Sequence, residues 1–135
     1  LLVSCFQNKE TSIATLVRAI TEQVDLENTS KPKVVLNKKN EALYFSRQPI
    51  PYFREKNISE WLSNGSYYNH IGIYGYRVEV LKEIAKLPIS KLEMTESLEQ
   101  LRWIDNGYKI QTAISNHIND SIDTPQDLEV IKRKD

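Results

Sequence analysis

Segments with the two-residue period of a β-strand alternate along this chain with segments of helical period, and this alternation constrains the fold more than any other feature. The residues from 70 to 76 alternate as in a strand. One face of this predicted strand carries His70, Gly72, Tyr74 and Tyr76. Apolar residues then recur at helical spacing from residue 78 to residue 85. The chain therefore combines strands with helices rather than repeating one kind of element.

A β-hairpin is predicted in the first half of the chain. Lys33–Leu36 and Ala42–Ser46 are strand-like runs separated by a polar turn. Ile13–Val17 is a β-branched run that predicts a buried strand, and the residues from 108 to 114 alternate again as a strand. Because a hairpin joins the early strands while helices separate the later ones, we expect an α/β fold, with a mixed sheet flanked by helices. A chain of 135 residues fits one such domain.

The helix predicted after Pro88 has the clearest boundaries. Ser90 and Glu93 have the spacing of a capping box, and Asn106-Gly107 supplies a left-handed exit. The predicted apolar stripe of this helix consists of Met94, Leu98 and Leu101. The opposite side is predicted to carry Glu96, Glu99, Gln100 and Trp103. Such polar faces are often simply exposed to solvent, so the pattern alone does not assign a role.

The two ends of the chain carry further signals. Residues 124–127 have the order Thr-Pro-Gln-Asp, which predicts the start of a last helix. Asp123 directly precedes that helix, where a carboxylate either caps the N-terminus or holds a divalent cation. The chain opens at Leu1 without a methionine and runs into an apolar pattern, so we expect the end of a helix that belongs to a longer protein.

Composition and motifs exclude several classes of function. Eighteen basic and eighteen acidic side chains cancel, so a nucleic-acid partner is not expected. The apolar runs are far shorter than the roughly 20 residues that cross a bilayer, so a membrane partner is not expected either. The single cysteine, Cys5, cannot form an internal disulfide, which suits the cytoplasm. The four glycines match no phosphate-binding loop, and the common hydrolase and zinc motifs do not occur in the sequence.

Polar residues near the ends and on the open faces of the predicted strands are the candidates for chemistry. Arg47 follows a strand and can present its guanidinium fork to a carboxylate, although an ordinary surface ion pair is the commoner explanation for such an arginine. His70 and Tyr74 share a face with Gly72 between them, and a polyol could hydrogen-bond to both. The structural alternative is a core histidine beside a packed tyrosine.

Four collinear blocks of the sequence resemble the CMP-Kdo synthetases, or 3-deoxy-manno-octulosonate cytidylyltransferases. The first block runs from Lys33 to Leu36 and from Ala42 to Tyr52, with the motif Tyr-Phe-Ser-Arg ending at Arg47. The others are the His-Ile-Gly-Ile-Tyr-Gly-Tyr-Arg stretch at 70–77, the Leu-Glu to Gln-Leu-Arg stretch at 92–102, and Ile-Asp-Thr-Pro-Gln-Asp-Leu at 122–128. Together they cover most of the chain.

The resemblance implies a nucleotide-diphospho-sugar transferase-like α/β/α fold and an activity. Family members transfer CMP from CTP to the acidic sugar 3-deoxy-manno-octulosonate (Kdo), which gives CMP-Kdo and pyrophosphate for lipopolysaccharide synthesis, with Mg²⁺ as the metal. The residues it assigns to the sugar are Arg47, His70, Tyr74, Glu99 and Gln100. Asp123 would be a Mg²⁺ ligand, whereas Arg77 and Arg102 would be structural partners.

The resemblance also implies a homodimer. The rings that could form its interface, or instead cover the core of the domain, are Tyr52, Phe53, Trp61, Tyr67 and Tyr68.

Two departures from the family pattern qualify these expectations. Ser121 stands where a small residue, usually glycine, precedes the Ile-Asp-Thr-Pro block. The family's N-terminal motifs for CTP and for the second metal-binding aspartate are not in this sequence. We therefore expect residues 1–135 to be the sugar-binding and dimerisation part of a cytidylyltransferase domain that lacks its CTP-binding part and is inactive alone. The alternatives are a non-catalytic sugar-binding or dimerisation module, and a cytidylyltransferase for another acidic sugar such as a sialic acid.

Overall fold

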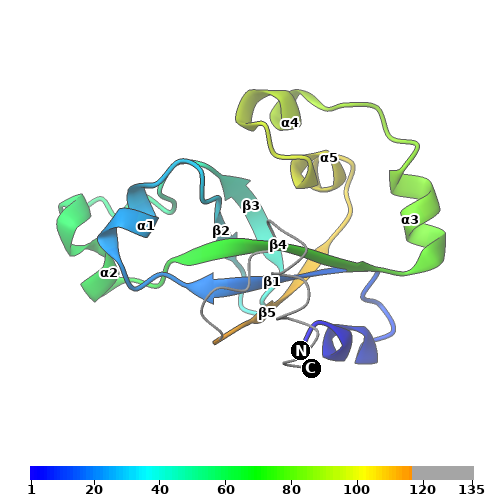
Figure 1. Cartoon of the computed structure of the whole chain (residues 1–135), viewed down its shortest axis with the longest axis horizontal. Helices are drawn as coiled ribbons and strands as arrows, with labels where there is room; N and C mark the ends of the chain where they lie inside the picture. The colour runs from blue at the N-terminus through cyan, green and yellow to red at the C-terminus, as the bar shows by residue number, and fades with distance from the viewer. Residues whose placement is uncertain (117–135) are drawn as a thin grey trace, which may run out of the picture.

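The computed structural model describes residues 1–116, which form a five-stranded mixed sheet in the order β3-β2-β4-β1-β5 (Figure 1). The strands are β1 (Ile13–Ala19), β2 (Lys33–Leu36), β3 (Ala42–Ser46), β4 (Tyr68–Tyr76) and β5 (Ile110–Ile114). Strands β1 and β5 are parallel, while the pairs β1–β4, β2–β4 and β2–β3 are antiparallel. The α/β class and the mixed sheet predicted from the sequence are confirmed, and the hairpin strands have the predicted bounds.

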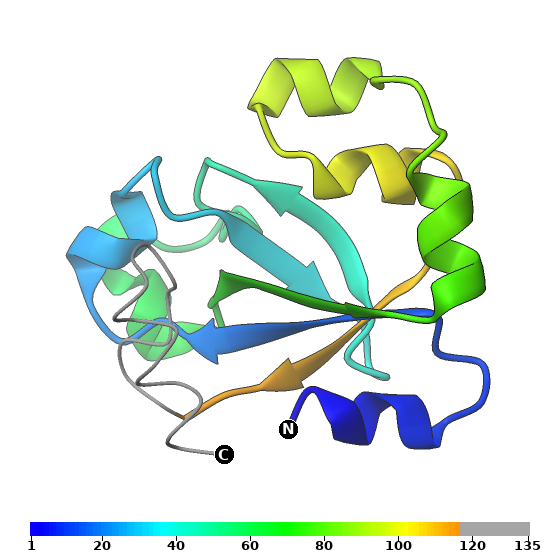
Figure 2. The ribbon, with the colours of Figure 1, turned by 45° about the vertical axis from the view of Figure 1, so that its right-hand side comes forward.

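Short helices surround this sheet. They are η1 (Val3–Gln7), α1 (Gln23–Glu27), η2 (Ile58–Glu60), α2 (Trp61–Asn64), α3 (Val78–Ile84), α4 (Lys91–Glu96) and α5 (Gln100–Asp105). Helices α4 and α5 lie over one face of the sheet and η1 lies on the other side, as Figures 1 and 2 both show. The helix predicted at the start of the chain is present as the 3₁₀ helix η1. It packs closely, because a Cβ built on Gly75 would lie 2.8 Å from the ring of Phe6.

A bulge interrupts the pairing of β4 with β1. Thr15 pairs with Tyr74 and the next residue, Leu16, pairs with Ile71, so Gly72 and Ile73 have no Cα partner in this register. The sequence predicts the strand but not the bulge. His70 and Tyr74 still lie on the same side, with ring centroids 5.3 Å apart, so their predicted common face is confirmed.

The helix predicted after Pro88 is divided in two. The capping box is confirmed, with the Glu93 N–H donating to Ser90 Oγ at 3.2 Å and the Ser90 N–H donating to the Glu93 carboxylate at 3.3 Å. At Ser97, however, the backbone turns left-handed with φ 55° and ψ 46°, and α4 ends there. Gly107 takes the predicted left-handed exit with φ 87°.

This break changes which side chains face the sheet. Gln100 and Trp103 are each 5% exposed, so their predicted place on the side opposite the apolar stripe is wrong. Met94, predicted in the apolar stripe, is 69% exposed, whereas Leu98 and Leu101 are buried as predicted. The change of direction at Ser97 rotates the second half of the helix relative to the first, which places Gln100 over the sheet.

Two apolar clusters hold the fold together. The main one lies between the sheet and the helices α3 to α5, and its buried members are Ile13, Val17, Val34, Phe45, Ile84, Leu98, Leu101, Trp103 and Ile110. The second one consists of Ile20, Leu26, Trp61 and Tyr67. Trp61 and Tyr67 therefore cover a core of the domain itself, while Tyr52 is 77% exposed.

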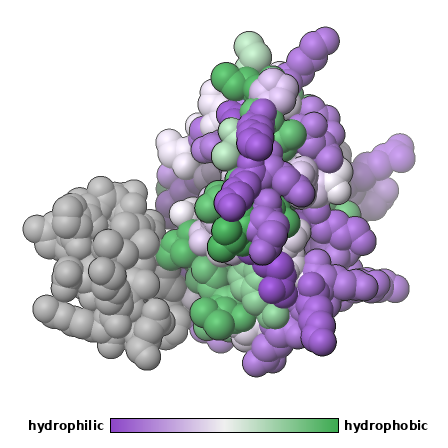
Figure 3. Space-filling model, turned by 90° about the vertical axis from the view of Figure 1, so that its right-hand side faces the viewer, coloured by the Kyte–Doolittle hydropathy of each residue, from purple (hydrophilic) through white to green (hydrophobic). Residues whose placement is uncertain are grey.

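The face of the molecule that carries α3 and η1 is largely hydrophilic (Figure 3). Figure 3 views the molecule from the right-hand side of Figure 1, where α3 and η1 lie, and shows polar side chains interleaved with apolar ones. The exposed large apolar residues on or beside these two elements are Leu1, Val3, Val78 and Leu81. Within residues 1–116, no helix has the length and apolar character needed to cross a membrane.

Candidate functional site

A polar cluster lies between β1, β4 and α5, and we call Thr15, His70, Tyr74 and Gln100 the His70 cluster. The His70 ring is bonded at both nitrogens: Nε2 lies 2.8 Å from Thr15 Oγ1, and Nδ1 lies 3.4 Å from Gln100 Nε2. The Phe45 and His70 rings form a T-shaped pair with their centroids 4.9 Å apart. Three of the predicted sugar-binding residues, His70, Tyr74 and Gln100, therefore converge.

The titratable groups of the His70 cluster are held neutral. Burial lowers the pKa of His70 from its ordinary 6.5 to about 4, because the charged imidazolium loses its hydration. Burial, followed by the neighbouring Tyr76 and Glu99, raises the pKa of Tyr74 well above its ordinary value. At neutral pH the cluster can therefore donate and accept hydrogen bonds without carrying charge, which suits hydroxyl groups of a ligand.

Glu99 stands at the edge of this cluster. It is the N-cap residue of α5, directly before Gln100, and its side chain is exposed. Its negative charge also helps to raise the pKa of Tyr76, after burial. Glu99 therefore lies close to the two tyrosines, on the solvent-exposed side of the cluster.

Arg47 has a different environment. Its guanidinium donates from Nε to the Glu96 carbonyl at 2.6 Å, from Nη2 to the Ser97 carbonyl at 2.9 Å, and from Nη1 to the Thr29 carbonyl at 3.0 Å. The Arg47 N–H also donates to the Glu96 carboxylate at 3.0 Å, and that carboxylate accepts from the Tyr44 hydroxyl. These contacts, which we call the Arg47 clasp, tie the end of β3 to the helix break at Ser97.

The two other arginines in the family-like blocks have structural contacts, as predicted. Arg102 donates twice to the Glu93 carboxylate, from Nε at 2.8 Å and from Nη2 at 2.6 Å, which links α5 to the capping box of α4. Arg77 donates to backbone carbonyls near η1, including that of Thr11 at 2.7 Å. The pKa of Glu93 is lowered, chiefly by its hydrogen bond to Arg102.

Sequence reasoning missed Thr15. This residue is fully buried in the middle of β1, and its hydroxyl contacts the His70 ring and two carbonyls of β4. A signal was present, because a threonine interrupts the apolar run from Ile13 to Val17. A buried hydroxyl needs a hydrogen-bond partner, so a threonine in a buried strand points to a polar group on a neighbouring element.

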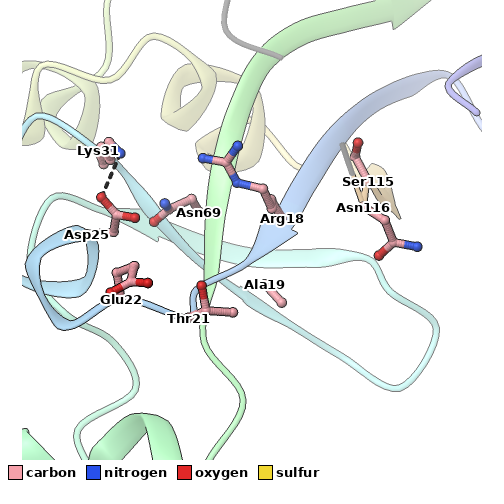
Figure 4. Close-up of a pocket in the computed structure, with 9 residues that line it drawn as sticks. All are labelled: Arg18, Ala19, Thr21, Glu22, Asp25, Lys31, Asn69, Ser115 and Asn116. Carbon is pink, nitrogen blue, oxygen red and sulfur yellow. Dashed lines mark hydrogen bonds and ion pairs between the residues drawn. The ribbon is translucent and has the colours of Figure 1, made fainter. Parts of the chain in front are cut away.

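A cavity of about 480 Å³ lies at the carboxyl ends of the parallel strands β1 and β5 (Figure 4). It is lined by Arg18, Ala19, Thr21, Glu22, Asp25, Lys31, Asn69, Ser115 and Asn116. Lys31 and Asp25 form an ion pair at 2.7 Å across part of it. Because Asn69 and His70 are successive residues of β4, their side chains point to opposite faces, so this cavity is separate from the His70 cluster.

The described residues do not assemble a metal centre. Within residues 1–116, no three histidine, cysteine, aspartate or glutamate side chains are grouped as ligands. Asp123, the predicted Mg²⁺ ligand, lies outside the described residues. The same is true of the predicted last helix.

The neutral His70 ring should make stability depend on pH. Between pH 6.5 and pH 4 the unfolded chain binds a proton at His70 that the folded chain does not, so the free energy of unfolding falls as the pH falls. From pH 7 to pH 5 the expected loss from this residue is about 2 kcal/mol. Urea unfolding at the two pH values measures it, with H70Q as the control. An equal loss in H70Q would show that other groups are responsible.

Comparison with known proteins places this geometry in a family. The sequence model of a family described as Cytidylyltransferase matches residues 2–110. The 3-deoxy-manno-octulosonate cytidylyltransferase of Parabacteroides distasonis is 54% identical over 130 residues, which cover 93% of this chain and 52% of that protein. The protein of that name from Bacteroides thetaiotaomicron is 56% identical over 128 residues, covering 93% and 51%.

A solved structure agrees with the sequence comparisons. The structure of CMP:2-keto-3-deoxy-manno-octonic acid synthetase complexed with CTP matches with a TM-score of 0.79 and 37% identity, covering 98% of this chain and 53% of that one. The resemblance found in the sequence and the expected fold are thus both confirmed. This chain spans about half the length of the curated relatives it matches. It belongs to the cytidylyltransferase family.

Proposed function

We propose that this chain is part of an enzyme that transfers CMP from CTP to Kdo, giving CMP-Kdo and pyrophosphate for lipopolysaccharide synthesis. The observation that carries the proposal is the 54% identity over 130 residues to a protein named as a 3-deoxy-manno-octulosonate cytidylyltransferase. Residues 1–135 would serve as the sugar-binding and dimerisation part of the transferase domain.

The proposed role of the described residues is to hold the acceptor sugar. Kdo is rich in hydroxyl groups, and the His70 cluster offers neutral donors and acceptors on a rigid sheet and helix. Tyr74 and Gln100 would bind sugar hydroxyls beside His70, and the exposed Glu99 carboxylate would accept a hydrogen bond from a further hydroxyl. Such contacts fix the orientation of the attacking hydroxyl, which is a large part of catalysis in a displacement at phosphorus.

Arg47 could bind the sugar carboxylate only through the N–H groups that are not used in the Arg47 clasp. A guanidinium has five N–H groups, and three of them donate to the carbonyls of Thr29, Glu96 and Ser97. We therefore propose that Arg47 supports the sugar site mainly by holding the helix break, with direct contact to the carboxylate as a second role.

Magnesium is proposed through Asp123. A carboxylate oxygen is a ligand that Mg²⁺ accepts, and the ion would offset the charge of the nucleotide phosphates. Residues 1–116 do not form a metal site by themselves, so the proposal needs Asp123 and further ligands.

A homodimer and a cytoplasmic location complete the proposal. The exposed ring of Tyr52 borders a cavity of about 410 Å³ whose lining includes Trp61 and Ile58. Exposed tyrosines such as Tyr52 are enriched at protein interfaces. Light scattering of the full-length protein should show a dimer, and a monomer over the whole concentration range would contradict this part. The lone Cys5 suits a reducing compartment.

The test is a pyrophosphate-release assay of the full-length protein with CTP, Kdo and Mg²⁺. Turnover with Kdo is expected, and much weaker turnover with a sialic acid. Preference for the sialic acid would support the alternative acceptor. No release with either sugar would contradict the transfer and leave a binding module.

A further inference from the structure

Thr15 contacts three groups with a hydroxyl that has one proton. Its Oγ1 lies 2.8 Å from His70 Nε2, 2.7 Å from the Ile73 carbonyl oxygen and 3.2 Å from the Ile71 carbonyl oxygen. A carbonyl oxygen can only accept, whereas an imidazole nitrogen donates or accepts according to its tautomer. The position of the Thr15 proton therefore determines which nitrogen of His70 carries its own proton.

The bulge in β4 decides where the Thr15 proton goes. Gly72 and Ile73 lie outside the register with β1, so the Ile73 carbonyl is displaced from the ladder and approaches the Thr15 hydroxyl. The contact between Thr15 Oγ1 and the Ile73 carbonyl oxygen is the shortest of the three. A carbonyl displaced from the strand ladder needs another hydrogen-bond donor. With the hydroxyl proton directed to Ile73, Oγ1 has only lone pairs to offer, and His70 Nε2 must donate to it.

The other side of the ring leads to the same tautomer independently. Gln100 Nε2 lies 3.4 Å from His70 Nδ1. An amide nitrogen only donates, so Nδ1 must present a lone pair. Both neighbours thus favour a neutral ring with its proton on Nε2. The ring stays neutral because burial lowers the pKa of His70.

We propose that Thr15 is a positioning residue of the sugar site, which fixes His70 in the Nε2–H tautomer so that Nδ1 accepts a hydrogen bond from a hydroxyl of a polyhydroxylated ligand. The inference rests on the proposed function for the identity of that ligand. The contact of Nδ1 with Gln100 is long for a hydrogen bond, so a ligand hydroxyl can replace or join it. Without the Thr15 hydroxyl, a proton on Nε2 would be buried without its acceptor. The proton then moves to Nδ1 as the Gln100 amide rotates to present its oxygen, and Nδ1–H would repel a donating hydroxyl.

The first test is spectroscopic and does not depend on activity. The full-length protein is labelled with ¹⁵N-histidine, and the His70 signals are those absent from the spectrum of H70Q. At neutral pH we expect a protonated Nε2 and an unprotonated Nδ1. A protonated Nδ1 would overturn the inference even if the enzyme turns over Kdo, whereas an enzyme without turnover would overturn the proposed function and leave the tautomer assignment standing.

The second test uses two substitutions of Thr15. T15V keeps the shape of the side chain and removes the hydroxyl, while T15S keeps the hydroxyl. T15V should shift a large fraction of His70 to the Nδ1–H tautomer and raise the KM for Kdo about tenfold, the equivalent of one lost hydrogen bond, with the KM for CTP unchanged. T15S should restore the wild-type tautomer and KM.

Two outcomes would refute the role of Thr15: a wild-type ring spectrum in T15V, or a T15S protein with the T15V spectrum. If T15V does not fold, the spectra of the wild type and of T15S still test the proposal. Both proteins must show His70 as the Nε2–H tautomer, and an Nδ1–H ring in either would overturn it.

Discussion

Replacing Trp103 with alanine should lower the free energy of unfolding by about 4 kcal/mol, the usual cost of removing a buried tryptophan. Trp103 is 5% exposed, and its ring meets Tyr74 edge-on at 4.9 Å and Tyr76 at 5.7 Å between centroids. The substitution would leave a cavity between α5 and β4, beside Tyr74 of the His70 cluster. Urea unfolding of the wild type and W103A measures the loss.

W103F is the matched comparison, because phenylalanine keeps a ring in contact with the tyrosines. It should retain more than half of the stability that W103A loses. If W103A were as stable as the wild type, α5 would not be packed on the sheet as described, and the placement of Gln100 would have no support.

Removing the Arg47 side chain should cost about 3 kcal/mol of stability, because three charge-assisted hydrogen bonds to backbone carbonyls are lost. R47K should recover less than half of that loss, since one ammonium cannot span the carbonyls of Thr29, Glu96 and Ser97 in place of a planar fork. Denaturant unfolding of R47A and R47K gives both values.

The same two proteins separate the two roles of Arg47. If the clasp is its main role, R47A is less stable and the KM for Kdo rises as a consequence of the displaced helix break. If R47A kept wild-type stability while its KM for Kdo rose, Arg47 would be a direct sugar ligand only, and the clasp would contribute nothing measurable.

The strands were predictable from the sequence because their signals are local. The hairpin at Lys33–Leu36 and Ala42–Ser46 has alternating and β-branched residues bounded by a polar turn, and the structure keeps those bounds. The capping box at Ser90 and the exit at Gly107 are likewise short-range patterns, and both are present.

The features that were not predictable depend on contacts between distant segments. Ser97 is left-handed where the Arg47 clasp holds the carbonyls on both sides of the break, and Arg47 is far from Ser97 in the sequence. The bulge at Gly72 is bridged by the hydroxyl of Thr15 from another strand. The sequence pattern predicted one continuous helix through Ser97. That prediction placed Gln100 and Trp103 on the wrong face of the helix.

The candidate site was only partly predictable, because some of its contacts are local and others join distant segments. His70 and Tyr74 share a face by strand geometry, and the structure brings them together. Gln100 was suggested by the family resemblance and joins them only because the helix is broken. Thr15 has no motif of its own, and its role depends on a tertiary contact with His70.

The steady-state kinetics of Q100A in the full-length enzyme test most directly whether the His70 cluster is the sugar side of the active site. We predict that the KM for Kdo rises at least about tenfold, as expected for a lost hydrogen bond to the ligand, while the KM for CTP stays the same. Q111A is the matched control, because Gln111 lies on β5 and donates to the Lys39 carbonyl instead, so neither KM should change. A Q100A enzyme with an unchanged KM for Kdo, or with both KM values raised equally, would contradict the account.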